Sequence, residues 1–191
     1  MVICITGKIG SGKSTVARLL SERLGWRVID VDGIGHEILE RDDVKEKIVE
    51  IFGENVVRCG RVDRSRLRKI VFEDEDNLKR LEKLLHPLMV EEILNELRWL
   101  DNAIIDCALL ERMKLLNLCD LVITVISSYE ISRSRKPGLS DEEFESIWNS
   151  QRDVRPIGIL IENNGDLETL EENVKRLMEH LEISPRHRTA R

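Results

Sequence analysis

Residues 4–15 have the sequence CITGKIGSGKST, in which an apolar run gives way to glycines and then to a lysine and two hydroxyl residues. Gly7, four further residues, Gly12, Lys13 and Ser14 satisfy the pattern GxxxxGK[ST]. Glycines let consecutive backbone N–H groups of such a loop turn toward phosphate oxygens, and the following helix adds the partial positive charge of its N-terminus. The stretch therefore predicts a strand, a phosphate-binding loop and a helix, with a nucleoside triphosphate as ligand.

Particular residues of this loop suit particular parts of ATP. We expect Lys13 to reach the β- and γ-phosphates, which makes it a candidate catalytic residue, and we expect the Ser14 hydroxyl to bind the Mg²⁺ that accompanies ATP. The residues expected to contact ATP are Gly10, Ser11, Gly12, Lys13, Ser14 and Thr15. The loop does not identify the phosphoryl acceptor, because motors, switches and kinases all contain it.

Apolar segments of strand length alternate with segments of helical period along the chain. Continuous runs rich in β-branched residues are typical of strands buried on both faces of a parallel sheet. The segments of this kind are 2–6, 27–30, 103–107, 121–126 and 157–161. They predict an α/β fold with three layers, in which a five-stranded parallel sheet is flanked by helices and binds ligands at the carboxyl ends of its strands.

Helical spacing is clear in two places. Val16, Leu19, Leu20 and Leu24 follow the phosphate loop, with Gly25 where the helix would end, and apolar residues recur at the same spacing from Leu167 to Leu181. Residues 42–100 contain helical patterns and no convincing strand, so we interpret them as a helical insertion. Pro87 is expected to kink or split a helix there, after Leu85 or His86.

Carboxylates stand at the ends of two further predicted strands. Asp30 ends the second strand and Asp32 comes two residues later, and we expect this strand to neighbour that of the phosphate loop. A carboxylate there can accept and orient a hydroxyl for in-line attack on the γ-phosphoryl group, although such a pair is also typical of a helix cap. Asp106 closes the third strand and is a candidate Mg²⁺ ligand, directly or through water, although a carboxylate is also common at plain strand ends.

Composition limits the class of protein. The chain has 191 residues, of which 41% are hydrophobic and 35% charged, and this suits one sizeable folded core. A formal net charge of −6 argues against broad nucleic-acid binding. No apolar run approaches the roughly 20 residues of a membrane helix, and the N-terminus lacks a secretory pattern. We therefore expect no nucleic-acid or membrane partner and a cytoplasmic location.

The cysteines show no CxxC spacing. They are Cys4, Cys59, Cys107 and Cys119, and three of them lie in or beside apolar runs. We interpret them as small buried thiols rather than as disulfides or zinc ligands.

Taken together, the motifs resemble those of the dephospho-coenzyme A kinase family in order and spacing. They are ITGKIGSGKST at 5–15, IDVDGIGHEI at 29–38, GRVDRSRLRKIVF at 60–72, LEKLLHPLM at 81–89 and ILIENNGDLETL at 159–170. The resemblance covers nearly the whole chain and implies an adenylate-kinase-like core, a helical domain that receives the acceptor, and a mobile lid. It places the core at 1–41, 101–127 and 157–183, the insertion at 42–100 and the lid at 128–156. The implied reaction is ATP-dependent phosphorylation of the ribose 3′-hydroxyl of dephospho-CoA.

The resemblance also implies roles for individual residues. Asp32 matches the family's proposed catalytic carboxylate, and Arg135 is the lid arginine that we expect to contact the transition state; the other lid arginines are Arg133, Arg152 and Arg155. The acceptor-binding residues implied in this way are Asp32, His36, Arg64 and His86, and the Mg²⁺ ligands are Ser14 and Asp106. ATP with Mg²⁺ and dephospho-CoA are the expected partners, and no oligomeric state is predicted beyond the possibility of a monomer.

The chain departs from the family pattern at three places. Lys8 stands where a second glycine is usual, only residues 152–156 separate Gln151 from the last predicted strand, and CALLERM around Glu111 lacks the family's proline and aromatic residue.

Two other functions use the same phosphate loop. One is a kinase for another small hydroxyl acceptor, such as a nucleoside or a sugar acid, and the other is an ATP-binding regulator that transfers nothing to a small molecule.

Overall fold

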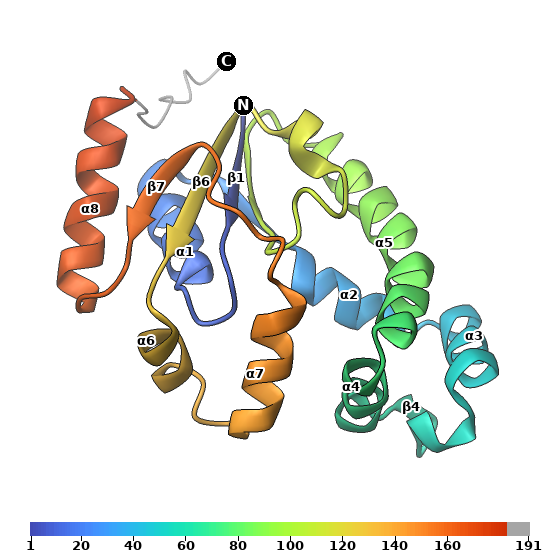
Figure 1. Cartoon of the computed structure of the whole chain (residues 1–191). Helices are drawn as coiled ribbons and strands as arrows, with labels where there is room; N and C mark the ends of the chain where they lie inside the picture. The colour runs from blue at the N-terminus through green and yellow to red at the C-terminus, as the bar shows by residue number, and fades with distance from the viewer. Residues whose placement is uncertain (183–191) are drawn as a thin grey trace.

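A computed structural model describes residues 1–182 and shows a parallel sheet with helices on both faces (Figure 1). The strand order is β2-β5-β1-β6-β7, and each neighbouring pair is parallel. The strands are β1 (Val2–Thr6), β2 (Arg27–Asp30), β5 (Ala103–Asp106), β6 (Leu121–Ile126) and β7 (Ile159–Glu162). The predicted α/β fold class, with its five parallel strands, is confirmed.

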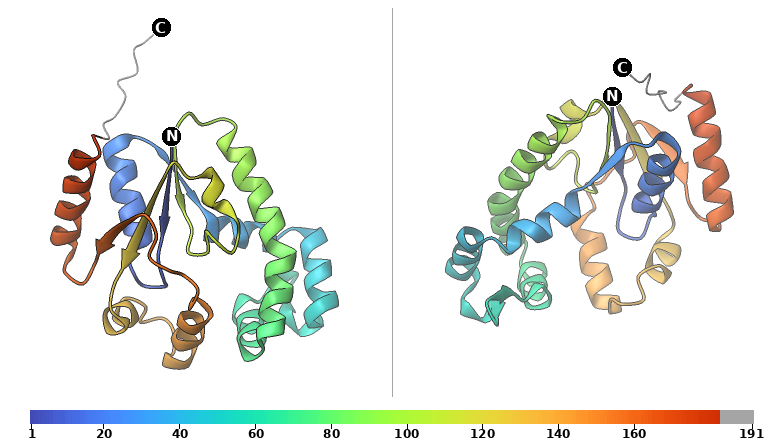
Figure 2. Two further views of the ribbon diagram at one scale, coloured as in Figure 1. Left: turned by 45° about the horizontal axis from the view of Figure 1, so that its top comes forward. Right: turned by 180° about the vertical axis from the view of Figure 1, so that it is seen from behind.

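Side chains of the central strands alternate between two hydrophobic cores. Ile3 and Ile5 of β1 join one core with helices α1 (Lys13–Leu24) and α8 (Leu167–His180), whereas Cys4 joins the other. Figure 2 shows α1 and α8 together on one side of the sheet. This alternation produces the three layers, because each strand must bury both of its faces.

The core on the other face of the sheet includes buried residues of the helices of residues 31–97. These are α2 (Val31–Leu39), α3 (Asp42–Phe52), α4 (Arg64–Glu73) and α5 (Glu75–Leu97), with a short 3₁₀ helix, η1 (Glu54–Val56). The remaining helices are η2 (Leu115–Leu118), α6 (Tyr129–Ser134) and α7 (Asp141–Ser150), of which α6 and α7 lie between β6 and β7. Within residues 1–182, no helix combines the length and the apolar character needed to cross a membrane.

Two predictions of strand positions were wrong. Residues 42–100 do contain strands, since β3 (Val57–Arg58) and β4 (Arg61–Val62) form a small antiparallel hairpin. Two residues per strand are too few for an alternating pattern to be visible in the sequence. The last strand begins two residues later than expected, at Ile159, because Gly158 has a φ of 67° and interrupts the extended backbone.

Pro87 does not end a helix, because α5 continues through it. A proline removes one backbone hydrogen bond, here to the carbonyl of Lys83, and Lys83 is exposed, so water can satisfy that carbonyl. Leu85, Met89 and Ile93 are buried on either side of the proline. Tertiary packing along one face of α5 therefore outweighs the local preference for a break.

The neighbour of β1 was also predicted wrongly. We expected β2 beside β1, but β5 lies between them, with Asp106 opposite Asp30 in β2 and opposite Ile5 in β1. The end of β2 consequently reaches the phosphate loop only across the end of β5. This order brings the carboxylates of two strands to the same edge of the sheet.

The cysteines differ from one another. Cys4 and Cys119 form a disulfide with a Cα–Cα distance of 5.6 Å, so the prediction of free thiols was wrong for this pair. Cys119 comes just before β6, which pairs with β1, and the 115 residues between the two cysteines conceal this proximity in the sequence. Cys107 is a buried free thiol, as expected, and burial raises its pKa to about 12. Cys59 is a free thiol but is exposed, so the prediction that it is buried was wrong.

We predict that Cys119→Ser has a free energy of unfolding about 2–4 kcal/mol lower than that of the wild type, measured at neutral pH without reductant so that the wild-type disulfide is intact. The reason is that the disulfide closes a long loop and so restricts the unfolded chain. Thermal unfolding with and without dithiothreitol measures this. The reductant should lower the melting temperature of the wild type and leave that of Cys119→Ser unchanged. Cys59→Ser, which removes an exposed free thiol, is the matched control.

Candidate active site

The phosphate loop, residues 7–12, connects β1 to the first turn of α1. Gly10 has a φ of 76° and Gly12 a φ of 99°, a region that favours glycine. A Cβ atom on Gly10 would lie 2.3 Å from the carbonyl oxygen of Ser132, and one on Gly12 would lie 2.2 Å from Nδ2 of Asn163. The loop therefore needs glycine at both positions, for its backbone conformation and for the close approach of α6 and of the segment after β7.

Lys13 joins two of the predicted carboxylates. Its Nζ lies 3.8 Å from Oδ2 of Asp32 and 3.8 Å from Oδ1 of Asp106. The Lys13 side chain is 13% exposed, that of Asp106 is 6% exposed and that of Asp32 is 68% exposed. One ammonium group is thus held between a buried carboxylate and an open one, at the carboxyl edge of the sheet.

Asp32 is not part of a strand. β2 ends at Asp30, and Asp32 lies in the first turn of α2, so the chain leaves the strand between the two carboxylates, as the proposed role of Asp32 requires. His36 is also exposed and lies one turn further along α2, on the same side as Asp32. Asp30 lies close to Gly33, where an added Cβ would come within 2.9 Å of its Oδ2.

Asp106 is the buried acid of the site. Burial raises the pKa of its carboxyl group, Lys13 and the Ser14 hydroxyl act in the opposite direction, and Asp32 and Asp30 raise it further. Within residues 1–182, Oδ1 of Asp106 has no hydrogen-bond partner. A desolvated carboxylate oxygen beside an exposed serine hydroxyl fits a hard cation such as Mg²⁺.

The described residues contain no group of three or more His, Cys, Asp or Glu side chains that could hold a metal by themselves. Mg²⁺ bound with a nucleotide usually takes only one or two protein ligands, and substrate phosphates and water supply the rest. The donor set of Ser14 and Asp106 therefore suits a nucleotide-dependent site and not a permanent metal centre.

Arg135 is the arginine of residues 128–156 that contacts the phosphate loop. It caps the C-terminus of α6, and its Nη1 donates to the carbonyl oxygens of Gly10 and Ser11, each at 3.4 Å. Two other arginines of this region bind elsewhere: Arg133 pairs with Asp141 and Arg152 with Glu75 of α5. Arg135 is thus the one of these three whose guanidinium lies at the nucleotide end of the site.

Asn163 was not among the predicted site residues, although it lies in the Asn-Gly segment that carries part of the resemblance. Its side chain is buried, Nδ2 donates to the Ser11 carbonyl at 2.7 Å, and Oδ1 accepts from Nη2 of Arg135 at 3.2 Å. Its backbone carbonyl accepts from Nη1 of Arg135 at 3.0 Å. Asn163 therefore fixes both the phosphate loop and the arginine that reaches it.

Two predicted acceptor residues lie on the helices of residues 42–100. Arg64 is exposed at the start of α4, and His86 is half-buried in α5, where burial lowers its pKa, with Glu82 opposing the shift and Arg112 adding to it. In the described part of the chain, no hydrogen bond or ion pair joins Arg64, His36 or His86 to Lys13. The structure brings together Lys13, Asp32 and Asp106, with His36 one helical turn from Asp32, whereas Arg64 and His86 lie on the separate helices α4 and α5.

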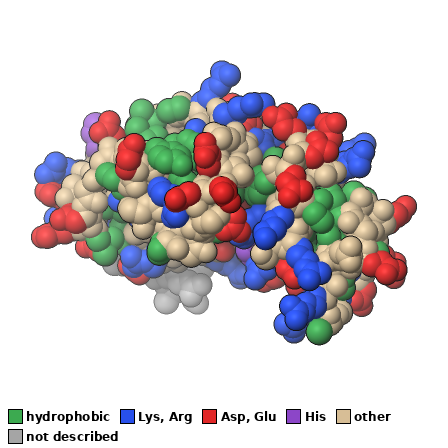
Figure 3. All heavy atoms as spheres, turned by 60° about the horizontal axis from the view of Figure 1, so that its bottom comes forward, with side chains coloured by type: hydrophobic (Ala, Val, Ile, Leu, Met, Phe, Trp, Pro, Cys, Tyr) green, Lys and Arg blue, Asp and Glu red, His purple; other side chains and the backbone are tan. Residues whose placement is uncertain are grey.

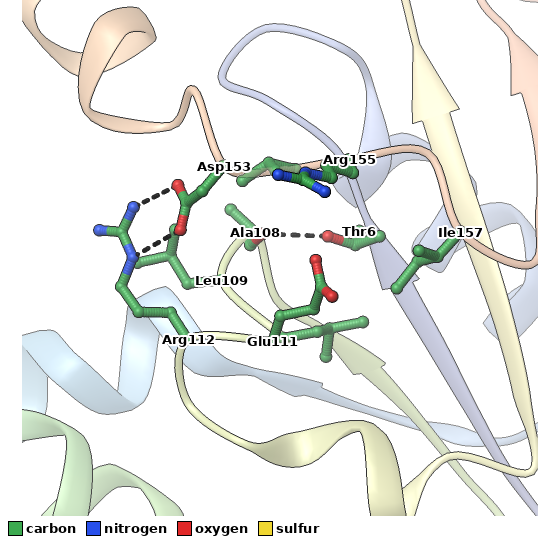
Figure 4. A pocket seen from close by; sticks show the side chains of 10 residues that line it. Thr6, Ala108, Leu109, Glu111, Arg112, Asp153, Arg155 and Ile157 are labelled. Atoms are coloured by element: carbon green, nitrogen blue, oxygen red, sulfur yellow. Dashed lines mark hydrogen bonds and ion pairs between the residues drawn. The ribbon is translucent and has the colours of Figure 1, made fainter.

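Arg112 connects three parts of the structure that are distant in sequence. It pairs with Glu82 of α5 and with Asp153, and its Nη2 donates to the Ser150 carbonyl at 2.7 Å. Figure 4 shows Arg112 and Asp153 bonded beside a small pocket that Thr6, Glu111 and Arg155 also line. Arg112 therefore ties the C-terminal end of α7 to α5.

A larger cleft of about 570 Å³ lies between α4 and α5 on one side and α7 on the other. Its lining combines apolar, amide and charged side chains, including Phe72, Leu78, Arg112, Asn149 and Arg152. Lys and Arg side chains lie among Asp and Glu side chains on the face that carries α4, α6 and α7 (Figure 3). Such a surface suits a ligand with both apolar and anionic parts better than a uniformly charged polymer.

Comparison with known proteins identifies the family. The family model described as dephospho-CoA kinase matches residues 1–168. The chain belongs to the dephospho-CoA kinase family. It is 33% identical to the dephospho-CoA kinase of Fusobacterium nucleatum over 94% of this chain and 97% of that one, and 34% identical to that of Aquifex aeolicus over 96% and 98%.

A crystal structure of a protein from Thermus thermophilus is similar throughout, with a TM-score of 0.75 and 33% identity over 95% of this chain and 97% of that one. Membership in the dephospho-CoA kinase family makes the chain an ATP-dependent kinase of coenzyme A biosynthesis. The acceptor implied by the sequence motifs is thereby confirmed at the level of the family, and neither a nucleoside kinase nor a regulator without transfer activity fits this family.

We predict that Asp106→Asn raises the free energy of unfolding at neutral pH when nucleotide and Mg²⁺ are absent, because a neutral amide avoids the burial of a charge. The folded-state pKa of Asp106 is raised, so its destabilising effect is complete above that pKa and fades as the pH falls toward the ordinary value. The advantage of the variant should therefore shrink at acid pH.

Urea unfolding of both proteins at neutral pH and near about pH 4 measures this difference. Asp30→Asn, which neutralises the exposed carboxylate opposite Asp106 in the sheet, is the control. If Asp106→Asn is less stable than the wild type at neutral pH, attraction to Lys13 outweighs the cost of burial and the assignment is wrong.

Proposed function

We propose that this kinase transfers the γ-phosphoryl group of ATP to the ribose 3′-hydroxyl of dephospho-CoA, with Asp32 as the residue that orients the hydroxyl and receives its proton. The observation that carries this proposal is the position of Lys13 between Asp32 and Asp106. The same ammonium that would hold the γ-phosphate lies within 4 Å of the open carboxylate, so donor and acceptor groups can meet there.

The reaction forms a bond between the 3′-oxygen and the γ-phosphorus and breaks the bond from the γ-phosphorus to the oxygen that bridges it to the β-phosphorus. The proton of the hydroxyl passes to Asp32, and ADP leaves with coenzyme A as the other product. Asp32 is 68% exposed, which leaves it accessible to a substrate hydroxyl. Lys13 favours the transfer because it stabilises negative charge on the phosphoryl oxygens.

Ser14 and Asp106 are the residues that we propose to hold Mg²⁺ with ATP. When bound, the ion would neutralise charge on the β- and γ-phosphates. The Ser14 hydroxyl would bind it directly, and the Asp106 carboxylate would bind it directly or through water. The backbone N–H groups from Gly10 to Thr15 would hold the phosphates themselves.

Residues 128–156 act as a lid in this proposal, and residues 42–100 receive the acceptor. Arg135 would turn from the carbonyl oxygens of the phosphate loop to the transferring phosphoryl group when the lid closes. The cleft between α4, α5 and α7 would receive the part of dephospho-CoA that extends away from the ribose. His36, Arg64 and His86, which lie outside the lining of this cleft, would be further acceptor contacts. A cytoplasmic location agrees with a substrate and a donor that are both soluble metabolites.

We predict that Asp32→Asn lowers turnover with dephospho-CoA by roughly 10²- to 10⁴-fold, because the amide keeps the shape but cannot take up the proton. The affinity for ATP should change little. Turnover and ATP binding should be measured on one preparation, with phosphorus NMR to assign the phosphorylated hydroxyl and a panel of other hydroxyl acceptors for comparison.

Asp30→Asn is the matched control, since Asp30 lies two residues away and forms no ion pair with Lys13 in the described residues. An inactive Asp30→Asn enzyme beside a near-normal Asp32→Asn enzyme would move the role to Asp30. Phosphorylation of a different acceptor, without activity on dephospho-CoA, would refute the proposed function itself.

We predict that Ser14→Ala and Lys13→Ala impair turnover in different ways. Ser14→Ala should require several-fold more Mg²⁺ for half-maximal activity, because one oxygen ligand is lost. Lys13→Ala should lose activity at every Mg²⁺ concentration, because a charge on the phosphates is missing. Titration of Mg²⁺ at fixed ATP separates the two effects, and an unaltered Mg²⁺ requirement of Ser14→Ala would contradict its assignment as a ligand.

A further inference from the structure

Helix α7 contacts the outer side of the phosphate loop at two adjacent residues. The N–H group of Ile9 donates to Oε1 of Gln151 at 2.7 Å, and Nζ of Lys8 lies 4.7 Å from the centre of the Trp148 ring. Lys8 and Ile9 precede residues 10–15, which are the proposed phosphate contacts. Helix α7 therefore contacts the loop at residues that are not among the proposed phosphate contacts, so it does not compete with ATP for them.

Both contacting residues are held against α7 by their own surroundings. The Trp148 ring lies 5.2 Å from that of Tyr129 and 5.8 Å from that of Phe144, which is completely buried. Gln151 caps the C-terminus of α7, and it is the only glutamine in the chain. Aromatic packing restricts the Trp148 ring, and the backbone N–H of Gln151 is bonded to carbonyl oxygens of the last turn of α7, so both residues move with the helix and can transmit its displacement to the loop.

The opposite face of the same helix lines the proposed acceptor cleft. Trp148 and Gln151 are three residues apart and share one face of the helical end, whereas Ser146, Asn149 and Ser150 line the cleft from the other side. One short helix thus contacts the nucleotide loop on one side and the acceptor cleft on the other. A ligand that displaces α7 from the cleft side must also displace Trp148 and Gln151.

We propose that Trp148 and Gln151 are positioning residues that couple the binding of dephospho-CoA to the affinity of the phosphate loop for ATP. The inference rests on the proposed function in one respect, namely that the acceptor occupies the cleft beside α7. Lys8 has a defined part in this coupling, because its ammonium lies over the Trp148 ring of α7.

The coupling is measured as the ratio of two dissociation constants for a non-hydrolysable ATP analogue, one with saturating dephospho-CoA and one without it. Trp148 serves as the probe in a Trp26→Phe/Trp99→Phe protein, since Trp99 is 88% exposed and neither tryptophan contacts the phosphate loop in the described residues. Allosteric coupling of ordinary strength would make the two constants differ by about 5-fold or more.

Gln151→Met removes the hydrogen-bond acceptor at similar length, and Lys8→Met removes the cation over Trp148. Both should bring the ratio toward one, while Lys8→Arg, which keeps a cation over the ring, should preserve it. A lysine that acts only by attracting phosphates would change both constants equally and leave the ratio unchanged. Lys175→Met, on the exposed side of α8, is the matched control for removal of a positive charge.

A wild-type ratio of one, or a ratio that survives Gln151→Met and Lys8→Met, would overturn the coupling. Calorimetry of dephospho-CoA alone distinguishes this failure from that of the proposed function. Binding of dephospho-CoA with a ratio of one refutes only the coupling, whereas absence of any dephospho-CoA binding refutes both.

Discussion

The charge arrangement around Lys13 is the constraint on which the rest of the structure depends. Its ammonium lies between Asp106, which is buried at the end of β5, and Asp32, which is open in the first turn of α2. This arrangement requires β5 to lie between β1 and β2, so that the phosphate loop and both carboxylates meet at one edge of the sheet. The two hydrophobic cores above and below the sheet keep that strand order in place.

The phosphate loop is held from outside by parts of the chain that come much later in sequence. Asn163 binds the Ser11 carbonyl, Arg135 bonds to both of these residues, and Gln151 binds the N–H group of Ile9. These contacts involve the Ser11 carbonyl group and the N–H group of Ile9. The N–H groups of the second half of the loop are therefore left to face phosphates. The glycines allow the conformation of the loop, and the contacts from Arg135, Gln151 and Asn163 hold the loop in it.

Two stabilising features of the chain, the unbroken helix α5 and a disulfide, differ from what the sequence predicted. Helix α5 continues through Pro87 because buried residues on both sides of the proline hold it against the core, and the Cys4–Cys119 disulfide links β1 to the segment before β6. The buried Asp106 works in the other direction, since a desolvated carboxylate costs stability that a neutral residue would not.

The sequence by itself determined the features that depend on short-range patterns. These are the five strands, α1 with Gly25 at its end, the phosphate loop at residues 7–12 and the family, because apolar periodicity and closely spaced motifs are properties of neighbouring residues. The tertiary structure alone decided the order of the strands, the disulfide, and the positions of Asn163, Trp148 and Gln151 against the loop. Each of these joins residues separated by tens of positions, and no local pattern encodes which distant side chain will satisfy a given backbone group once the core has formed.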